Sequence, residues 1–429
     1  MYPDGVQEYR GAVGADRGSG RSWWTRLGTE TGLARLALGV IALHVADDNF
    51  LQPQPGTRAG DHLVSGLVPL AVLGLAAWGY PRLRAGFRAA IAVALGVFGI
   101  ATGIEAAYYT AKGNISGDDF TGLLAIPAGL TLVGIGIVTL WKSRRRDDSR
   151  RRRYLRRSLL AVGTLVVAYV LVVPLAMAYV LTHVARGFVP DPELGAPHEE
   201  VSFTTGDGLR LEGWYVPSKN RAAVIAFPGR RGPQRQTRML AQHGYGVLLF
   251  DRRGEGESEG DPNIFGWKGE RDLHAAVDYL RTRPDVDPSR IGGIGLSVGG
   301  EMMIEAAAES DGLRAIVSEG AGIRSIRESL ALSGTGTRLA ASLVHAVVTP
   351  GVALFSNTMP PPSLEDLVGR IAPRPVFLIY ATKGQGGEEL NAIFYDAARE
   401  PKTIWEMPAS HTGGIEAEPE EYERRVVGF

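Results

Sequence analysis

The chain has 429 residues, more than one globular domain usually needs, and equal numbers of basic and acidic side chains, 46 of each. This balance gives no support for nucleic-acid binding, and the absence of cysteine excludes disulfides, thiol catalysis and zinc sites with cysteine ligands. The composition changes near Arg186, where long apolar stretches give way to a mixed sequence. We therefore treat the chain as two regions.

The first region contains five apolar segments with few charges. They are Leu27–Val45, Leu63–Tyr80, Ala89–Tyr109, Phe120–Trp141 and Ser158–Val184. A helix needs about 20 apolar residues to cross a bilayer, and every segment except the first, which Arg35 interrupts, meets that requirement. The sequence predicts an α-helical multi-pass membrane domain of about five spans over residues 27–185, after a cytoplasmic tail over residues 1–26.

The charges of the connecting loops predict an orientation. Arginines crowd the loops after the second and fourth segments, Arg82–Arg88 and Lys142–Arg157, whereas Ala46–Asp61 and Ala111–Asp119 are richer in aspartate. The positive-inside rule places the arginine-rich loops in the cytoplasm. The fifth segment then leads outward, so residues 186–429 are predicted to be extracytoplasmic. We interpret the arginine cluster as a topology signal that contacts anionic membrane lipids.

Side chains of metal-ligand types gather near the predicted outer membrane face. They are His44, Asp47, Asp48, Asp61, His62 and Glu105. They lack a ligand spacing such as H-x-x-x-H, so we predict no metal site and no cofactor. A carboxylate within a membrane is costly and often functional, so Glu105 leaves open a small transporter or sensor with an accessory enzyme.

After Gly195, strand and helix patterns alternate, which is typical of an α/β fold with a mainly parallel sheet. Expected strands are Val201–Thr205, Leu209–Pro217, Ala222–Phe227, Tyr245–Phe250, Arg290–Gly295, Arg314–Val317, Pro375–Tyr380 and Thr403–Glu406, the first two forming a hairpin. Apolar spacing predicts an amphipathic helix over Glu270–Thr282. Between residues 323 and 370 the alternation breaks into irregular helical pieces, which predicts a lid over an active site.

The pentapeptide Gly295-Leu296-Ser297-Val298-Gly299 lies between a predicted strand and a predicted helix. A G-x-S-x-G serine in that context adopts a tight turn and presents its hydroxyl at the positive end of the helix. Larger neighbours than glycine would collide there. The pattern indicates a nucleophile elbow, the mark of a serine hydrolase.

Three motifs then occur in one order: Asp251-x-Arg253-Gly254-x-Gly256-x-Ser258, Asp287-Pro-x-Arg290-Ile-Gly leading into the elbow, and Ser410-His411-Thr412. With them, residues 195–429 resemble the α/β-hydrolase superfamily, within the esterase-like group of dienelactone-hydrolase-like and prolyl-oligopeptidase-like enzymes. The resemblance implies an α/β-hydrolase domain over residues 186–429 that uses a serine, an acid and a histidine in that chain order. The first 185 residues lie outside it.

The resemblance implies roles for individual residues. Ser297 is the expected nucleophile and His411, which follows the last strand, is the expected base. The family carries an aspartate after the strand at 375–380, but residues 381–389 contain none. Glu388 is the first carboxylate there, and Glu319 and Glu389 remain as alternatives, because only geometry can decide.

The resemblance also places an oxyanion hole. One N–H belongs to Val298, directly after the nucleophile, and the second is expected from Arg230, since Pro228-Gly229-Arg230 stands where the family has His-Gly-x. Asp251 and Arg253 are expected to be structural.

We therefore expect a membrane-anchored serine hydrolase that acts on a small-molecule or lipid carboxylic ester. A peptidase, an acyltransferase on lipid or glycan acceptors, and an inactive receptor or scaffold remain alternatives. The expected pocket is lined from the lid by Leu330, Leu339, Leu343, Val347, Leu354 and Phe355, which form either an acyl site or internal lid packing. Substrate identity and oligomeric state do not follow from the sequence.

Overall fold

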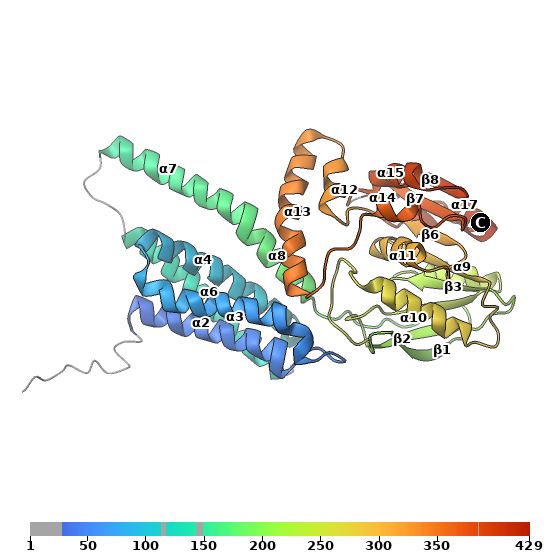
Figure 1. The fold of residues 1–429 in the computed structure, drawn as a ribbon, viewed down its shortest axis with the longest axis horizontal. Coiled ribbons are helices and arrows are strands. Elements are labelled where there is room, and N and C mark those ends of the chain that lie inside the picture. Colours follow the sequence, from blue (N-terminus) through green and yellow to red (C-terminus); the bar gives the residue numbers. More distant parts are fainter. Residues whose placement is uncertain (1–27, 113–116, 143–148, 385) are drawn as a thin grey trace, which may run out of the picture.

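The computed structural model describes residues 28–112, 117–142, 149–384 and 386–429. The predicted tail over residues 1–26 lies outside this range, as do parts of two predicted loops. Helices at the N-terminal side form one region and an α/β sheet with its helices forms another, with α13 standing between them (Figure 1).

The described residues of the N-terminal region form helices joined by short loops. Its helices are α2 (Glu30–Ala46), α3 (Leu63–Gly79), α4 (Ala85–Thr102), α5 (Ile104–Ala111), α6 (Gly117–Lys142), α7 (Arg150–Val167) and α8 (Val173–Thr182), with short helical turns η1 (Asp47–Leu51), η2 (Ala59–His62), η3 (Tyr80–Arg82) and η4 (Ala168–Val172). Helices α2, α3, α4 and α6 run alongside one another as a bundle (Figure 1).

Helix α4 packs closely against α6 because both carry glycine at their contact. A Cβ added to Gly96 would lie 2.7 Å from the Gly129 carbonyl oxygen, and one added to Gly129 would lie 2.5 Å from the Gly96 carbonyl oxygen. Any larger residue would force the two backbones apart. Small residues at such contacts are typical of helices that pack within membranes.

Four helical stretches among the described residues are long and apolar enough to cross a membrane: Ala59–Arg82, Ala85–Ala111, Phe120–Lys142 and Thr335–Phe355. The first three coincide with the second, third and fourth predicted segments. The first predicted segment forms α2, of 17 residues, and the fifth is divided among α7, η4 and α8, of which Ala168–Thr182 is a shorter apolar helix. The last of the four stretches is α13, in the other region.

The second region is built on one eight-stranded sheet in the order β1-β2-β4-β3-β5-β6-β7-β8. Its strands are β1 (Glu199–Thr204), β2 (Arg210–Val216), β3 (Ala223–Phe227), β4 (Gly246–Phe250), β5 (Ile291–Leu296), β6 (Ile316–Glu319), β7 (Val376–Lys383) and β8 (Lys402–Ser410). Strand β2 pairs antiparallel with β1 and β4, and all other pairs are parallel. The predicted hairpin and mainly parallel sheet are confirmed.

Helices cover both faces of the sheet. They are α9 (Gln234–Gln242), α10 (Gly269–Arg281), α11 (Val298–Glu309), α15 (Asn391–Ala397), α16 (Gly414–Ala417) and α17 (Pro419–Gly428), with the turn η5 (Glu388–Leu390) before α15. Strand β4 is apolar on both faces of the sheet. Its Leu248 and Phe250 belong to one core cluster, and its Val247 and Leu249 belong to the other. Alternate residues of a strand point to opposite faces, so a doubly covered strand is apolar at every position.

The predicted insertion between β6 and β7 is helical and contains α12 (Ile326–Ala331), α13 and α14 (Leu364–Val368). Helix α13 (Thr335–Phe355) is one continuous helix of 21 residues, longer and more regular than the pieces that the sequence pattern predicts.

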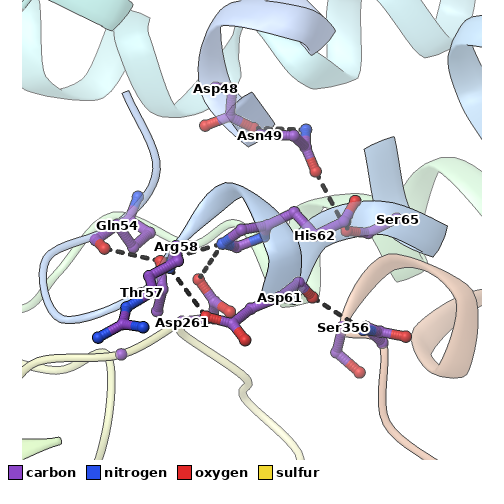
Figure 2. Close-up of polar contacts among 12 residues, drawn as sticks. Asp48, Asn49, Gln54, Thr57, Arg58, Asp61, His62, Ser65, Asp261 and Ser356 are labelled. Atoms are coloured by element: carbon purple, nitrogen blue, oxygen red, sulfur yellow. Dashed lines mark hydrogen bonds and ion pairs between the residues drawn. The ribbon is translucent and has the colours of Figure 1, made fainter. Parts of the chain in front are cut away.

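Polar contacts join the two regions near the turn η2, as Figure 2 shows. The ring of His62 lies between Thr57, whose hydroxyl is 3.0 Å from Nε2, and Asp261, whose Oδ1 is 3.8 Å from Nε2. The Asp61 carbonyl accepts a 2.8 Å hydrogen bond from Asn357, two residues after the end of α13, and the Pro55 carbonyl accepts one from the Gly260 N–H. The predicted outer loop is therefore in contact with both the α/β region and the end of α13.

The other metal-ligand types near this face have protein partners. His44 Nε2 is 2.8 Å from the Thr102 carbonyl oxygen, and the carboxylate of Asp48 lies 3.6 Å from His183. Within the described residues, no group of three or more histidine, aspartate or glutamate side chains has the arrangement of a metal site.

Candidate active site

Ser297 lies at the sharp turn between β5 and α11 with a φ of 53° and a ψ of −126°. A non-glycine residue rarely adopts a positive φ, so the surrounding turn must hold it there. Both flanking glycines are required: a Cβ on Gly295 would lie 2.3 Å from the Gly299 carbonyl oxygen, and one on Gly299 would lie 2.5 Å from Pro228 Cδ. The pentapeptide therefore has the geometry of a nucleophile elbow.

His411, directly after β8, connects Ser297 to Glu388. Its Nε2 is 2.8 Å from Ser297 Oγ, and its Nδ1 is 2.5 Å from Glu388 Oε1. A carboxylate only accepts hydrogen bonds, so the ring proton belongs on Nδ1 and Nε2 is left to accept the serine O–H. Ser297 and Glu388 thus join His411 in one hydrogen-bonded chain, although they lie 114 and 23 positions before it in the sequence.

Glu388 is almost completely buried, with 2% of its surface exposed, at the start of η5. Its Oε2 accepts a 2.8 Å hydrogen bond from the Ala381 N–H, at the end of β7. The loop between them closes tightly round the carboxylate, because a Cβ on Gly384 would lie 2.1 Å from Oε1. The loop from β7 thus brings a glutamate to the histidine where the family carries an aspartate.

The electrostatics of the site act on His411. The hydrogen bond to Glu388 raises the pKa of the His411 imidazole above its ordinary value of 6.5, and partial burial opposes that rise. The imidazolium is stabilised by the carboxylate beside it, which is what a base needs when it takes a proton from serine.

The alternative acids are engaged elsewhere. Glu319, at the end of β6, accepts hydrogen bonds from the Gly414 N–H at 2.9 Å and the Tyr422 hydroxyl at 2.6 Å, and burial raises the pKa of its carboxyl. Glu389 is exposed and accepts a 2.8 Å hydrogen bond from Ser333, between α12 and α13. Of the three predicted candidates, the structure brings Glu388 to His411.

The structure corrects the expected oxyanion donor Arg230. Its N–H already donates a 2.8 Å hydrogen bond to Asp251 Oδ1, so it is engaged within the protein. The Arg230 side chain is also buried, and its Nε donates to the other oxygen of the same carboxylate at 2.8 Å. Asp251 thus holds the turn that follows β3.

Other N–H groups remain for an oxyanion. Val298 is the first residue of α11, where an N–H has no carbonyl partner within the helix. In the turn after β3, the N–H groups of Gly229 and Arg231 have no protein acceptor among the described residues.

A buried carboxylate that no sequence motif singles out lies one helical turn after Ser297. Glu301, on α11, accepts a 3.2 Å hydrogen bond from the Gly322 N–H, just before the lid, and burial raises the pKa of its carboxyl to about 7. Its position four residues after the nucleophile, on the buried face of the helix, is the signal that could have identified it.

The sheet, the elbow and the order of the site residues define the α/β-hydrolase fold. Residues 192–361 match the profile of the X-Pro dipeptidyl-peptidase (S15) family. The C-terminal region therefore has the α/β-hydrolase fold and is similar to the S15 and esterase-like families. The predicted resemblance is confirmed.

Similar proteins each match part of the chain. The uncharacterized protein YfhR of Escherichia coli (strain K12) is 27% identical over 265 residues, which cover 56% of this chain and 85% of YfhR. The polyketide transferase grgF of a Penicillium species is 37% identical over 120 residues, which cover 26% of this chain and 41% of grgF. The Pyrococcus furiosus esterase Pf2001 superposes with a TM-score of 0.47 at 26% identity, over 58% of this chain and 96% of the esterase.

Proposed function

We propose that the protein is a serine hydrolase that cleaves carboxylic esters, with Ser297 as nucleophile, His411 as general base and Glu388 as the orienting acid. The observation that carries this proposal is the pair of hydrogen bonds that joins Glu388 to His411 and His411 to Ser297. A serine hydroxyl is a weak nucleophile until a base takes its proton, and this arrangement supplies the base.

The chemistry follows from these positions. Ser297 Oγ attacks the acyl carbon while its proton passes to His411 Nε2, and the carbonyl oxygen becomes an oxyanion beside the Val298 N–H. His411 then gives that proton to the leaving alcohol oxygen as the acyl–oxygen bond breaks. In the second half, His411 takes a proton from water, the hydroxide adds to the acyl-enzyme, and the proton returns to Ser297 as the acid leaves.

A peptidase is the second candidate, because residues 192–361 match a family described as X-Pro dipeptidyl-peptidase. Acyl transfer is a third outcome, since the relative grgF is described as a polyketide transferase. Assays of the same full-length preparation with a p-nitrophenyl ester, an X-Pro-p-nitroanilide, and an ester with added alcohol acceptor separate the three. Cleavage of the anilide in preference to the ester would replace the esterase proposal.

We also propose that the helical region anchors the enzyme in the cell membrane as a multi-pass domain and that the α/β region lies outside the cytoplasm. The long apolar helices and the arginine-rich loops support this orientation. Because the chain lacks cysteine, Gln242→Cys on α9 provides a single labelling site. A membrane-impermeant maleimide should label it in intact cells, and labelling only after lysis would reverse the orientation.

We expect kcat/KM for a short-chain ester to rise with pH through a midpoint above 6.5, because the reaction needs neutral His411 and Glu388 raises the pKa of that imidazole. Glu388→Gln removes the raising charge, so its midpoint should move to lower pH even as its plateau falls. Glu389→Gln serves as the matched control and should keep the wild-type midpoint. A midpoint that is the same in Glu388→Gln would contradict the assignment of the acid.

A further inference from the structure

Several large apolar side chains of the lid helices α12 and α13 are exposed. On α13, Leu339 is 60% exposed and Leu343 is 43% exposed, and on α12 Leu330 and Ile326 are also exposed. The expectation that Leu330, Leu339 and Leu343 line the pocket or pack inside the lid is therefore wrong, because these side chains lie on the lid's outer surface. Arg338 is the single charged side chain in the 21 residues of α13. Exposed apolar patches of this kind mark surfaces that meet a partner or a membrane.

The other half of α13 is packed against the apolar helices of the N-terminal region. A Cβ on Gly351 would lie 2.7 Å from the Ala178 side chain of α8, so the two helices approach closely there. The Phe355 ring lies 5.2 Å from Tyr179 of α8 and 6.2 Å from Phe98 of α4. The lid is therefore attached at its C-terminal half to two of the helices for which we propose a membrane location.

The helical segments that pack against α13, η4 and α8, also carry exposed apolar side chains. Leu171 of η4 and Val173 and Met177 of α8 are large apolar side chains that are also exposed. Figure 1 shows α13 running across the direction of the bundle helices, between the bundle and the sheet. If the bundle crosses the bilayer, α13 lies along the membrane surface on the side of the α/β region, as interfacial helices do.

Apolar contacts lead from this surface to the site. Trp267 packs in one cluster with Val348 and Val352 of α13, and its neighbour Gly266 lies against the Val298 side chain, since a Cβ there would be 2.8 Å from Val298 Cγ2. The same loop is hydrogen-bonded to α8, because the Ile264 N–H donates to the Leu181 carbonyl at 3.0 Å. The elbow and the membrane-facing helices are thus parts of one packed unit.

We propose that the exposed surface of α12 and α13 lies in the outer surface of the lipid bilayer, and that Ser297 receives its substrate from there as a lipid ester with a long acyl chain. This inference rests on the proposed function and names its substrate class. Transfer of a long acyl chain from a bilayer into water has a high free-energy cost. An apolar lid embedded in the membrane beside the site lets the chain reach Ser297 without that transfer.

Membrane contact is tested without catalysis. Leu339→Cys and Leu343→Cys, each labelled with a bimane in the full-length protein, are placed in phosphatidylcholine vesicles with and without brominated acyl chains. Strong quenching at both positions is expected, with little at the control Gln242→Cys on α9. Equal, weak quenching at all three positions would overturn the membrane location of α13, whatever the enzyme cleaves.

Substrate delivery is tested with the double variant Leu339→Glu/Leu343→Glu, because charges oppose burial in the interface. Cleavage of a soluble p-nitrophenyl acetate and labelling by a fluorophosphonate should stay at wild-type levels, while cleavage of a long-chain acyl ester in vesicles should fall about tenfold or more. The control Gln242→Glu/Thr282→Glu adds the same charge on α9 and after α10 and should change neither rate.

The outcomes separate the two proposals. An equal fall in the soluble and vesicle rates, or no fall in the vesicle rate, would overturn lipid delivery through the lid. Failure of well-folded wild-type protein to react with the fluorophosphonate would instead overturn the serine hydrolase function, and the quenching measurement would still decide where α13 lies.

Discussion

Ser297→Ala is expected to abolish both fluorophosphonate labelling and ester cleavage, with kcat lower by about 10⁶-fold, the loss typical of removing a triad serine. His411→Ala should lose nearly as much, because Ser297 then has no base, its hydroxyl lying 2.8 Å from His411 Nε2. The two residues act as one unit, so the double variant should be no slower than either single variant. Kinetics on a p-nitrophenyl ester with the full-length protein in detergent measure this.

The control for these variants is His243→Ala, a histidine on the protein surface beside Glu423 and distant in sequence from the site. It should keep wild-type labelling and kcat. Labelling that survives in Ser297→Ala would identify another nucleophile. Unlabelled but well-folded wild-type protein would favour the inactive receptor or scaffold instead.

Glu388→Gln is expected to reduce kcat by about 10⁴-fold with the fold intact, because an amide has nearly the same shape but lacks the charge that stabilises the imidazolium. The amide also permits the wrong ring tautomer, since its NH₂ can donate to Nδ1. Glu388→Asp should retain more activity than Glu388→Gln, because it keeps a carboxylate but shortens a side chain that reaches His411 at 2.5 Å.

Two matched glutamines show whether the effect belongs to this carboxylate. Glu389→Gln, next in the chain and exposed, should keep kcat within a few-fold of wild type. Glu319→Gln should lower the temperature of unfolding more than it changes kcat in the folded fraction, because Glu319 is buried against Tyr422 and Gly414. A 10⁴-fold loss in Glu319→Gln with Glu388→Gln active would move the role of the acid one strand earlier.

The sequence left open which glutamate lies beside His411. Glu319 ends β6 and Glu388 follows β7, and these two parallel strands lie side by side in the sheet. Both glutamates therefore lie at the same edge, where several strands end together. Which of the two reaches His411 depends on two tertiary contacts. The loop from Ala381 to Glu388 closes round Glu388, and the C-terminal helix α17 supplies Tyr422 as a partner for Glu319.

The contacts of Arg230 and of α13 also could not be predicted from the sequence. The turn after β3 lies where the motif order placed it, yet the Arg230 N–H is taken by Asp251, 21 residues along the chain. The sequence predicts that the residues of α13 belong to a lid, yet the helix is long and apolar enough to cross a membrane. It also packs on α8, which lies far before it in the chain.

By itself, the sequence determined the apolar helices, the strand periodicity, the mainly parallel α/β sheet and the elbow at Ser297, where Gly295 is required by its close approach to Gly299 four residues along the chain. Motif order then identified His411 as the histidine to expect. Only the tertiary structure decided which glutamate meets His411, that the Arg230 N–H is engaged, and that α13 lies against the N-terminal helices. These features depend on contacts between residues far apart in the chain, whose distances follow from how strands and helices pack and not from any local pattern.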